Sequence, residues 1–371
     1  MNIFRPRVSK TIKKILKKGS TVPLYFITVH KCEKLKNTNQ KYNKKYVSYK
    51  VLTIVFAILS GFNSFSQDDI FLNYYENVNI AEMNIVNKKL DSAIYFYDLA
   101  FPLTEKPMVK DIHNALMCAV SIKNNSKTQD YLEKITLKNL NPNYYKRYKL
   151  TKYLTKNQFK NIKERYKRKI NSYVYQFLDS LQNEDQKIRT QENYLKFHYK
   201  IIATDTSNYN CYIKFLENND FPDESQTINY PNQQRIDNIL FHHWFQTTHW
   251  FQMQKNNVDS LIIKQIKEFN IANYHYANFY DIRNGSFVGK PNYGMVFFVK
   301  YKHNVKLLNF SKEDLIQINK NRKDLGLDTR ENSIIKTSFF DKSKIFIFQN
   351  YGQTIIFSGG KTAEEQFNSL K

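Results

Sequence analysis

The spacing of hydrophobic residues changes once along the chain. Between residues 67 and 271, apolar residues recur every three or four positions, which is typical of amphipathic helices. The stretch NNDFPDESQTINYPNQQ interrupts this pattern, because Pro222 and Pro231 disfavour helix in the residues that precede them. We therefore expect a helical body with one break at that stretch.

After Gly285 the pattern favours strands. MVFFVKY and IFIFQNYGQTIIFSGG are rich in β-branched and aromatic residues, and NYGQ suits a turn between the last two strands. Between them, SKEDLIQINKNRKDLGL predicts a helix that Ser311 caps and Gly326 ends. The predicted fold is mostly α, with helical hairpin repeats packed on a helical domain. A small antiparallel β-sheet at the C-terminal end would make it α+β.

The first helical region, residues 67–170, has the residue spacing of a helical repeat. Ala81, Ala93, Tyr97 and Ala100 lie 12, 4 and 3 positions apart. This spacing resembles the tetratricopeptide repeat, in which small side chains let two antiparallel helices approach closely. We interpret the region as one recognisable repeat followed by a degenerate one. Residues 171–330 would then form a second helical domain, and residues 331–371 a C-terminal β-hairpin and tail.

A short apolar run, Val51–Phe62, predicts export. Its twelve residues are fewer than the roughly 20 of a membrane-spanning helix. They fit the apolar core of a signal peptide, which follows positive charge. We expect residues 47–66 to be a signal peptide that is cleaved after Ser66, the second of two small residues there. The alternative is a buried strand or a short core helix.

The basic residues 1–46 precede this run, although signal peptides are normally terminal. We therefore expect translation to start downstream of Met1. The mature chain would be periplasmic or extracellular, with no stable membrane span. An uncleaved signal would tether it to the membrane.

The net charge of +24 is concentrated in two segments. Residues 1–66 hold 14 basic residues and one acidic residue, and cleavage would remove them. Residues 141–170 hold 11 basic residues opposed only by Glu164. The second segment is a candidate contact for an acidic partner or an anionic surface, and the alternative is a solvated helix face. Its candidate residues are Lys163, Arg165, Lys167 and Arg168.

An exported chain rarely meets nucleic acid, so we expect none as a partner. Cys118 and Cys211 remain after cleavage and could form one disulfide.

The segment ILFHHWFQTTHWFQMQ concentrates histidines. On a helix, His242 and His249 share one face. No nearby acidic residue completes a metal-ligand set, so we expect no metal and no cofactor. The histidines are then either part of a polar cleft or structural.

Residues 181–327 resemble a bacterial family of domains of unknown function. Seven segments occur in the family's order: DQKIR, DTSNYN, NDFP, a helix with His249, YANFYDIR, GKPNYG and INKNRKDLGL. The resemblance implies a fold and a candidate site, and it supplies no known reaction. Its candidate residues are Asp185, Gln186, Arg189, His249, Asp281, Arg283, Tyr293 and Arg322.

The chain departs from the family pattern at three places. Asp220 replaces a glycine before Phe-Pro, and Ile282 separates an Asp-Arg pair that is normally adjacent. Met295 and Val296 replace Thr-Gln after Tyr-Gly. The lost polar side chains weaken the expectation of a shared chemical site.

These features support two functional hypotheses. The first is an exported binding or scaffold protein, in which the helical repeats contact a protein partner and the basic segment contacts an anionic surface. The second is a periplasmic enzyme, such as a hydrolase, with His249 as acid or base and Asp185 or Asp281 orienting it. Arg189 and Arg283 would hold an anionic group. The alternative for each Asp-Arg pair is an internal salt bridge that fixes helix packing.

Overall fold

The structure is a computed structural model. It describes part of the chain, and the extension 1–46 and the signal segment, apart from Ser66, lie outside that part. The described residues are 66–190, 196, 198–229, 234–237, 240–241, 243, 258–283, 292–295, 297–301, 304–307, 309–340, 345–348 and 353–357.

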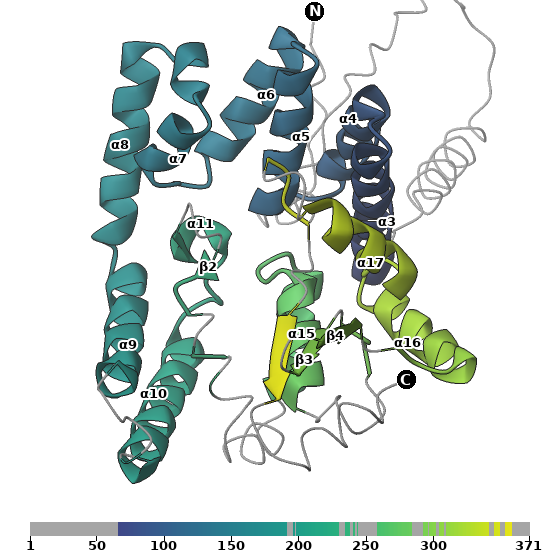
Figure 1. Ribbon diagram of the computed structural model, residues 1–371. Coiled ribbons are helices and arrows are strands. Elements are labelled where there is room, and N and C mark those ends of the chain that lie inside the picture. The colour runs from purple at the N-terminus through teal and green to yellow at the C-terminus, as the bar shows by residue number, and fades with distance from the viewer. Residues whose placement is uncertain are drawn as a thin grey trace, which may run out of the picture. The chain divides into compact units, whose positions relative to one another are not determined.

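Two helix pairs open the described chain. Helices α3 (Gln67–Val86) and α4 (Leu90–Ala100) pack against each other, and so do α5 (Val109–Ser121) and α6 (Asn125–Thr136) (Figure 1). A short 3₁₀ turn, η1 (Phe101–Leu103), follows α4. The side chains that suggested a repeat, at Ala81, Ala93, Tyr97 and Ala100, are all fully buried. The three alanines let the helices approach closely, and the Tyr97 ring fills the space between them.

A second set of helices continues from α6. It contains α7 (Pro142–Arg147), η2 (Leu150–Tyr153), α8 (Lys156–Ile170), α9 (Tyr173–Arg189) and α10 (His198–Asn218). Thr155 and Gln158 form a capping box at the start of α8. Helices α9 and α10 lie side by side (Figure 1). Phe177 on α9 and Phe215 on α10 stack with ring centroids 4.7 Å apart.

Short elements form at the predicted break. Asp223 caps α11 (Glu224–Thr227), and β1 (Ile228–Asn229) pairs antiparallel with β2 (Gln234–Arg235). Helices α14 (Val258–Lys267) and α15 (Asn273–Arg283) come next.

Strands and helices are mixed in the last part of the chain. β3 (Phe297–Tyr301) lies between β4 (Asn304–Leu307), which is antiparallel to it, and β5 (Gln353–Phe357), which is parallel to it. Helices α16 (Lys312–Asp324) and α17 (Arg330–Phe340) separate β4 from β5. The prediction for α16 is confirmed, because Ser311 caps it and Gly326 follows it at φ +68°.

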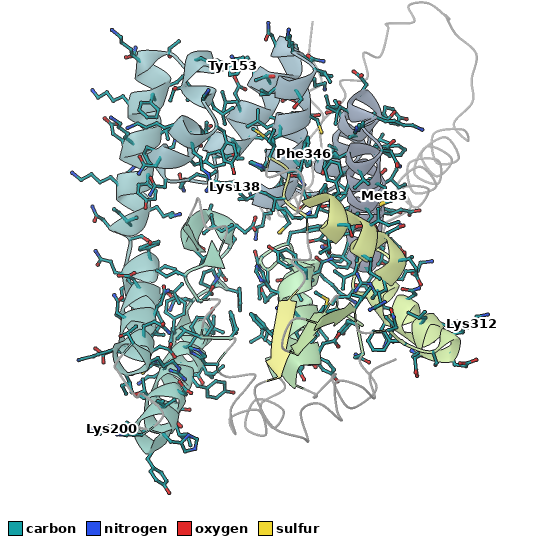
Figure 2. All side chains as sticks on the ribbon, in the orientation of Figure 1. Met83, Lys138, Tyr153, Lys200, Lys312 and Phe346 are labelled. Carbon is teal, nitrogen blue, oxygen red and sulfur yellow. The ribbon has the colours of Figure 1, made fainter. Side chains whose placement is uncertain are left out.

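The predicted antiparallel sheet at the C-terminal end is not supported. Residues 331–340, assigned to a β-hairpin, lie in helix α17, and β5 pairs with β3 in parallel. The apolar residues 345–348 form no strand. They pack on α5, where Asn114 exchanges two hydrogen bonds with the backbone of Ile347, at 2.6 and 2.8 Å. Figure 2 labels Phe346 in this segment.

The mostly helical prediction is confirmed for the described residues. None of their helices combines the length and apolar character needed to cross a bilayer. Cys118 is buried, Cys211 is exposed, and both are free thiols.

Candidate functional site

Helix α9 brings two of the predicted site residues together. Asp185 and Arg189 are one helical turn apart, and the Arg189 Nη1 donates to Asp185 Oδ1 at 2.8 Å. Gln186 Nε2 donates to the other carboxylate oxygen of Asp185 at 2.6 Å. The carboxylate is fully buried, so these bonds replace its lost hydration.

Two residues that the sequence did not assign to the site complete this cluster. Arg189 Nη2 binds both oxygens of Asp205 on α10, at 2.9 and 2.8 Å. His243 Nδ1 lies 2.8 Å from Asp185 Oδ1. Asp205 belongs to the DTSNYN segment, so the resemblance to the family pattern could have indicated this residue. His243 directly follows His242, but helical spacing selected His242 and His249 and did not favour His243.

The cluster has the donor set of a metal site but already contains a cation. Asp185, Asp205 and His243 offer ligand atoms that all lie within 4.8 Å of one another. Arg189 binds both carboxylates, so its guanidinium occupies the place that a metal ion would need. Burial raises the pKa of the Asp205 carboxyl, and the Arg189 charge opposes that shift. The cluster therefore acts as an ion bridge between α9, α10 and the segment of His243.

A second buried group surrounds Asp281 at the end of α15. Its carboxylate accepts hydrogen bonds from the backbone N–H groups of Asn292, Tyr293 and Met295, at 3.1, 3.0 and 2.9 Å. Burial raises the pKa of the Asp281 carboxyl, while these bonds lower it. The carboxylate thus holds in place the backbone of residues 292–295, which we call the Tyr-Gly loop.

Arg322 supports the same loop from α16. The side chain is fully buried, and it donates to the carbonyls of Tyr293 and Asp328 and to the Ser333 hydroxyl. Burial lowers the pKa of its guanidinium to about 10. A planar donor fork of this kind suits several fixed acceptors at once. Arg322 is therefore engaged with the protein itself.

The predicted site residues thus fall into two groups. Asp185, Gln186 and Arg189 belong to the first, and Asp281, Tyr293 and Arg322 belong to the second. His249 and the side chain of Arg283 lie outside the described residues.

The basic segment lies on α7, η2 and α8. Lys156, Lys160, Lys163 and Lys167 are spaced by 4, 3 and 4 residues and are all exposed. This spacing places them along one side of α8, and we call these four residues the α8 stripe. Lys163 Nζ lies 5.0 Å from the ring centre of Phe159. Among the described residues, no ion pair involves the stripe.

The other predicted basic residues flank the stripe. Arg168 is exposed, and Arg165 is half-buried on another side of α8. Arg165 lines a hollow of about 180 Å³ between α6 and α8, with Leu132 and Ile162 in its wall. That volume is below the roughly 300–1,000 Å³ of small-molecule sites. The hollow can therefore admit a side chain but not a typical cofactor.

Comparisons with protein-family models, curated proteins and solved structures gave no match to this chain. The resemblance of residues 181–327 to a bacterial family of unknown function stays a prediction.

Proposed function

We propose that this chain is an exported binding protein whose α8 stripe contacts an acidic segment of a partner protein. The observation that supports it is the row of exposed lysines at Lys156, Lys160, Lys163 and Lys167, which form no ion pair with any residue that the structure describes. Four like charges repel one another along a helix, which costs stability in the free protein. An acidic partner relieves that repulsion.

The shape of the stripe favours a protein segment over a membrane surface. The four lysines form a single row along a helix of 15 residues. A single row of positive charges is complementary to a single row of negative charges, such as one side of an acidic helix. Proteins that lie on a bilayer usually add an apolar face that enters the lipid, and the stripe itself contains only lysines.

The binding function is favoured over the enzymatic one by the engagement of the candidate carboxylates. Asp185 is bound by Arg189, Gln186 and His243, and Asp281 is bound by three backbone N–H groups. These contacts give both carboxylates a structural role. Export rests on the signal-like residues 47–66, and the repeat-like α3–α6 region is a further proposed contact for a protein partner.

Charge reversal tests the proposal. The full chain is titrated against a labelled helical peptide whose glutamates are spaced by 4, 3 and 4 residues. Changing Lys160, Lys163 and Lys167 to Glu should weaken binding at least about tenfold. Three lost or repulsive pairs of about 0.5 kcal/mol each give that factor. Binding of the wild-type chain should also weaken as salt increases.

Two controls make the result specific. Changing Lys312, Lys320 and Lys323 to Glu alters the net charge equally on the exposed part of α16 and should leave binding unchanged. A peptide of the same composition with the glutamate spacing broken should bind more weakly than the matched peptide. Equal binding of both peptides, or tighter binding to anionic lipid vesicles than to the matched peptide, would contradict the proposal.

A further inference from the structure

A second hollow lies at the C-terminal end of α6, apart from the residues discussed so far. Its volume is about 350 Å³, within the roughly 300–1,000 Å³ of small-molecule sites. Phe101 and Pro107 line it from the connection between α4 and α5, and Asp223 and Ser225 line it from α11. The rest of the lining consists of Lys106, Lys134 and Lys138 together with Thr104, Glu105 and Leu137.

Lys138 is the unusual member of this lining. Its side chain is 8% exposed, and no hydrogen bond or ion pair holds its ammonium group within the described part of the chain. The two other lysines have partners. Lys106 donates to Asn270 Oδ1 at 2.8 Å, and Lys134 lies 3.4 Å from Asp130. Figure 2 labels Lys138.

The Lys138 side chain is largely buried, but its ammonium group keeps some access to solvent, and among the described residues no acidic side chain lies in contact with it. Burial lowers the pKa of the Lys138 amine, and the carboxylates of Glu224 and Asp223 raise it without forming an ion pair. The Asp223 carboxylate is already occupied, because its Oδ1 accepts from Ser225 and Gln226 as the cap of α11. An external anion would supply the missing counter-charge.

The walls of the hollow are tied to one another. Val109 N at the start of α5 donates to Glu224 Oε2 at 2.7 Å, which joins α5 to α11. Asn139 Nδ2 donates to the Ser225 carbonyl at 3.5 Å, which joins the end of α6 to α11. The hollow is therefore formed before any ligand arrives, which reduces the entropy lost on binding.

We propose that this hollow binds a small organic anion, with its carboxylate or phosphate against Lys138 and its apolar part against Phe101 and Pro107. Lys106 and Lys134 add positive potential around the charged group, and the Glu105 and Asp223 carboxylates of the lining offset part of it. The site is separate from the α8 stripe, so either can fail without the other.

Calorimetric titration of the full chain tests this site with three probes. Benzoate and phenyl phosphate combine a ring with an anionic group, and phenol offers the ring alone. At least one of the two anions should bind, and phenol should bind at least tenfold more weakly. The anion that binds more tightly identifies the preferred charged group.

Two variants and their controls locate the binding. Lys138→Met removes the charge and should abolish binding of the anion, while Lys312→Met, at an exposed position on α16, should leave it unchanged. Leu137→Glu places a negative charge at the rim of the hollow, where the side chain is 62% exposed, and should weaken binding at least tenfold. Leu99→Glu makes the same change on α4 and should have no effect. Binding that persists in Lys138→Met, or its absence from the wild-type chain, would overturn the proposal.

Discussion

Single residues in this chain show how buried charges are stabilised. The carboxylate of Asp281 sits among three backbone N–H groups, and that of Asp185 accepts from a guanidinium and an amide. Bonds to a charged acceptor stabilise more than neutral ones. Each carboxylate is therefore expected to contribute to the free energy of unfolding.

Asp281→Asn should destabilise the fold by about 3 kcal/mol, because an amide group cannot accept all three backbone bonds. Denaturant unfolding measures this loss. Asp324→Asn, at an exposed position at the end of α16, should change stability by less than about 0.5 kcal/mol. An Asp281→Asn chain as stable as the wild type would refute the structural role of this carboxylate.

Only part of the residue-scale picture could be predicted from the sequence. Asp185 and Arg189 are four residues apart on a helix, so local spacing predicts their salt bridge as one alternative. Asp205 and His243 join them from other segments, and no local pattern relates those positions. The partners of Asp281 are backbone groups, which every residue except proline offers, so the sequence did not single them out.

Helices were predicted more reliably than strands, and α5 illustrates the reason. The Ile345–Phe348 segment has the composition of a strand, and its pattern could not reveal that its partner is a helix. His113 Nε2 lies 2.8 Å from the Ile345 carbonyl, and Asn114 binds Ile347. These side chains supply hydrogen bonds that a neighbouring strand would otherwise provide. The α16 prediction succeeded because its cap and its glycine stop are local signals.

His113 makes stability depend on pH at this contact. Burial lowers the pKa of its imidazole from 6.5 to about 4, so the unfolded chain takes up a proton that the folded chain does not. The contribution is fully present above pH 6.5 and is lost as the pH falls towards 4, by about 3 kcal/mol in total. Urea unfolding at pH 7 and pH 4.5 measures it.

A His113→Gln variant provides the comparison for this prediction. Other groups titrate in the same range, and their effect is shared by both chains. The wild type should therefore lose more stability than the variant between the two pH values. Equal losses in the two chains would show that His113 does not titrate as its burial requires.

Across the whole molecule, a buried ion network joins the first described helices to the last. Lys110 on α5 pairs with Glu82 on α3, and Lys336 on α17 lies 2.7 Å from both Glu82 and Asp328. Burial favours the neutral form of Glu82, but the two lysines prevail and lower its pKa. Glu82 and Lys336 are 254 positions apart, so no local pattern could indicate their contact. The network crosses the boundaries predicted at residues 170 and 330.

At the same scale, the α8 stripe differs from this network, because its lysines are exposed and unpaired among the described residues. Charges with internal partners stabilise the fold, and charges without them are available to another molecule. We therefore expect the stripe to bind an acidic protein segment.

Crosslinking in the cells that make the protein tests whether the α8 stripe binds such a segment. A photoreactive residue replaces Glu164, which is exposed and neighbours the stripe on α8, and a second chain has it at exposed Asn183 on α9. We expect position 164 to crosslink to a peptide rich in Asp and Glu, and we expect the change of Lys160, Lys163 and Lys167 to Glu to abolish this product. Crosslinks from position 164 only to lipid, or the same products from position 183, would contradict it.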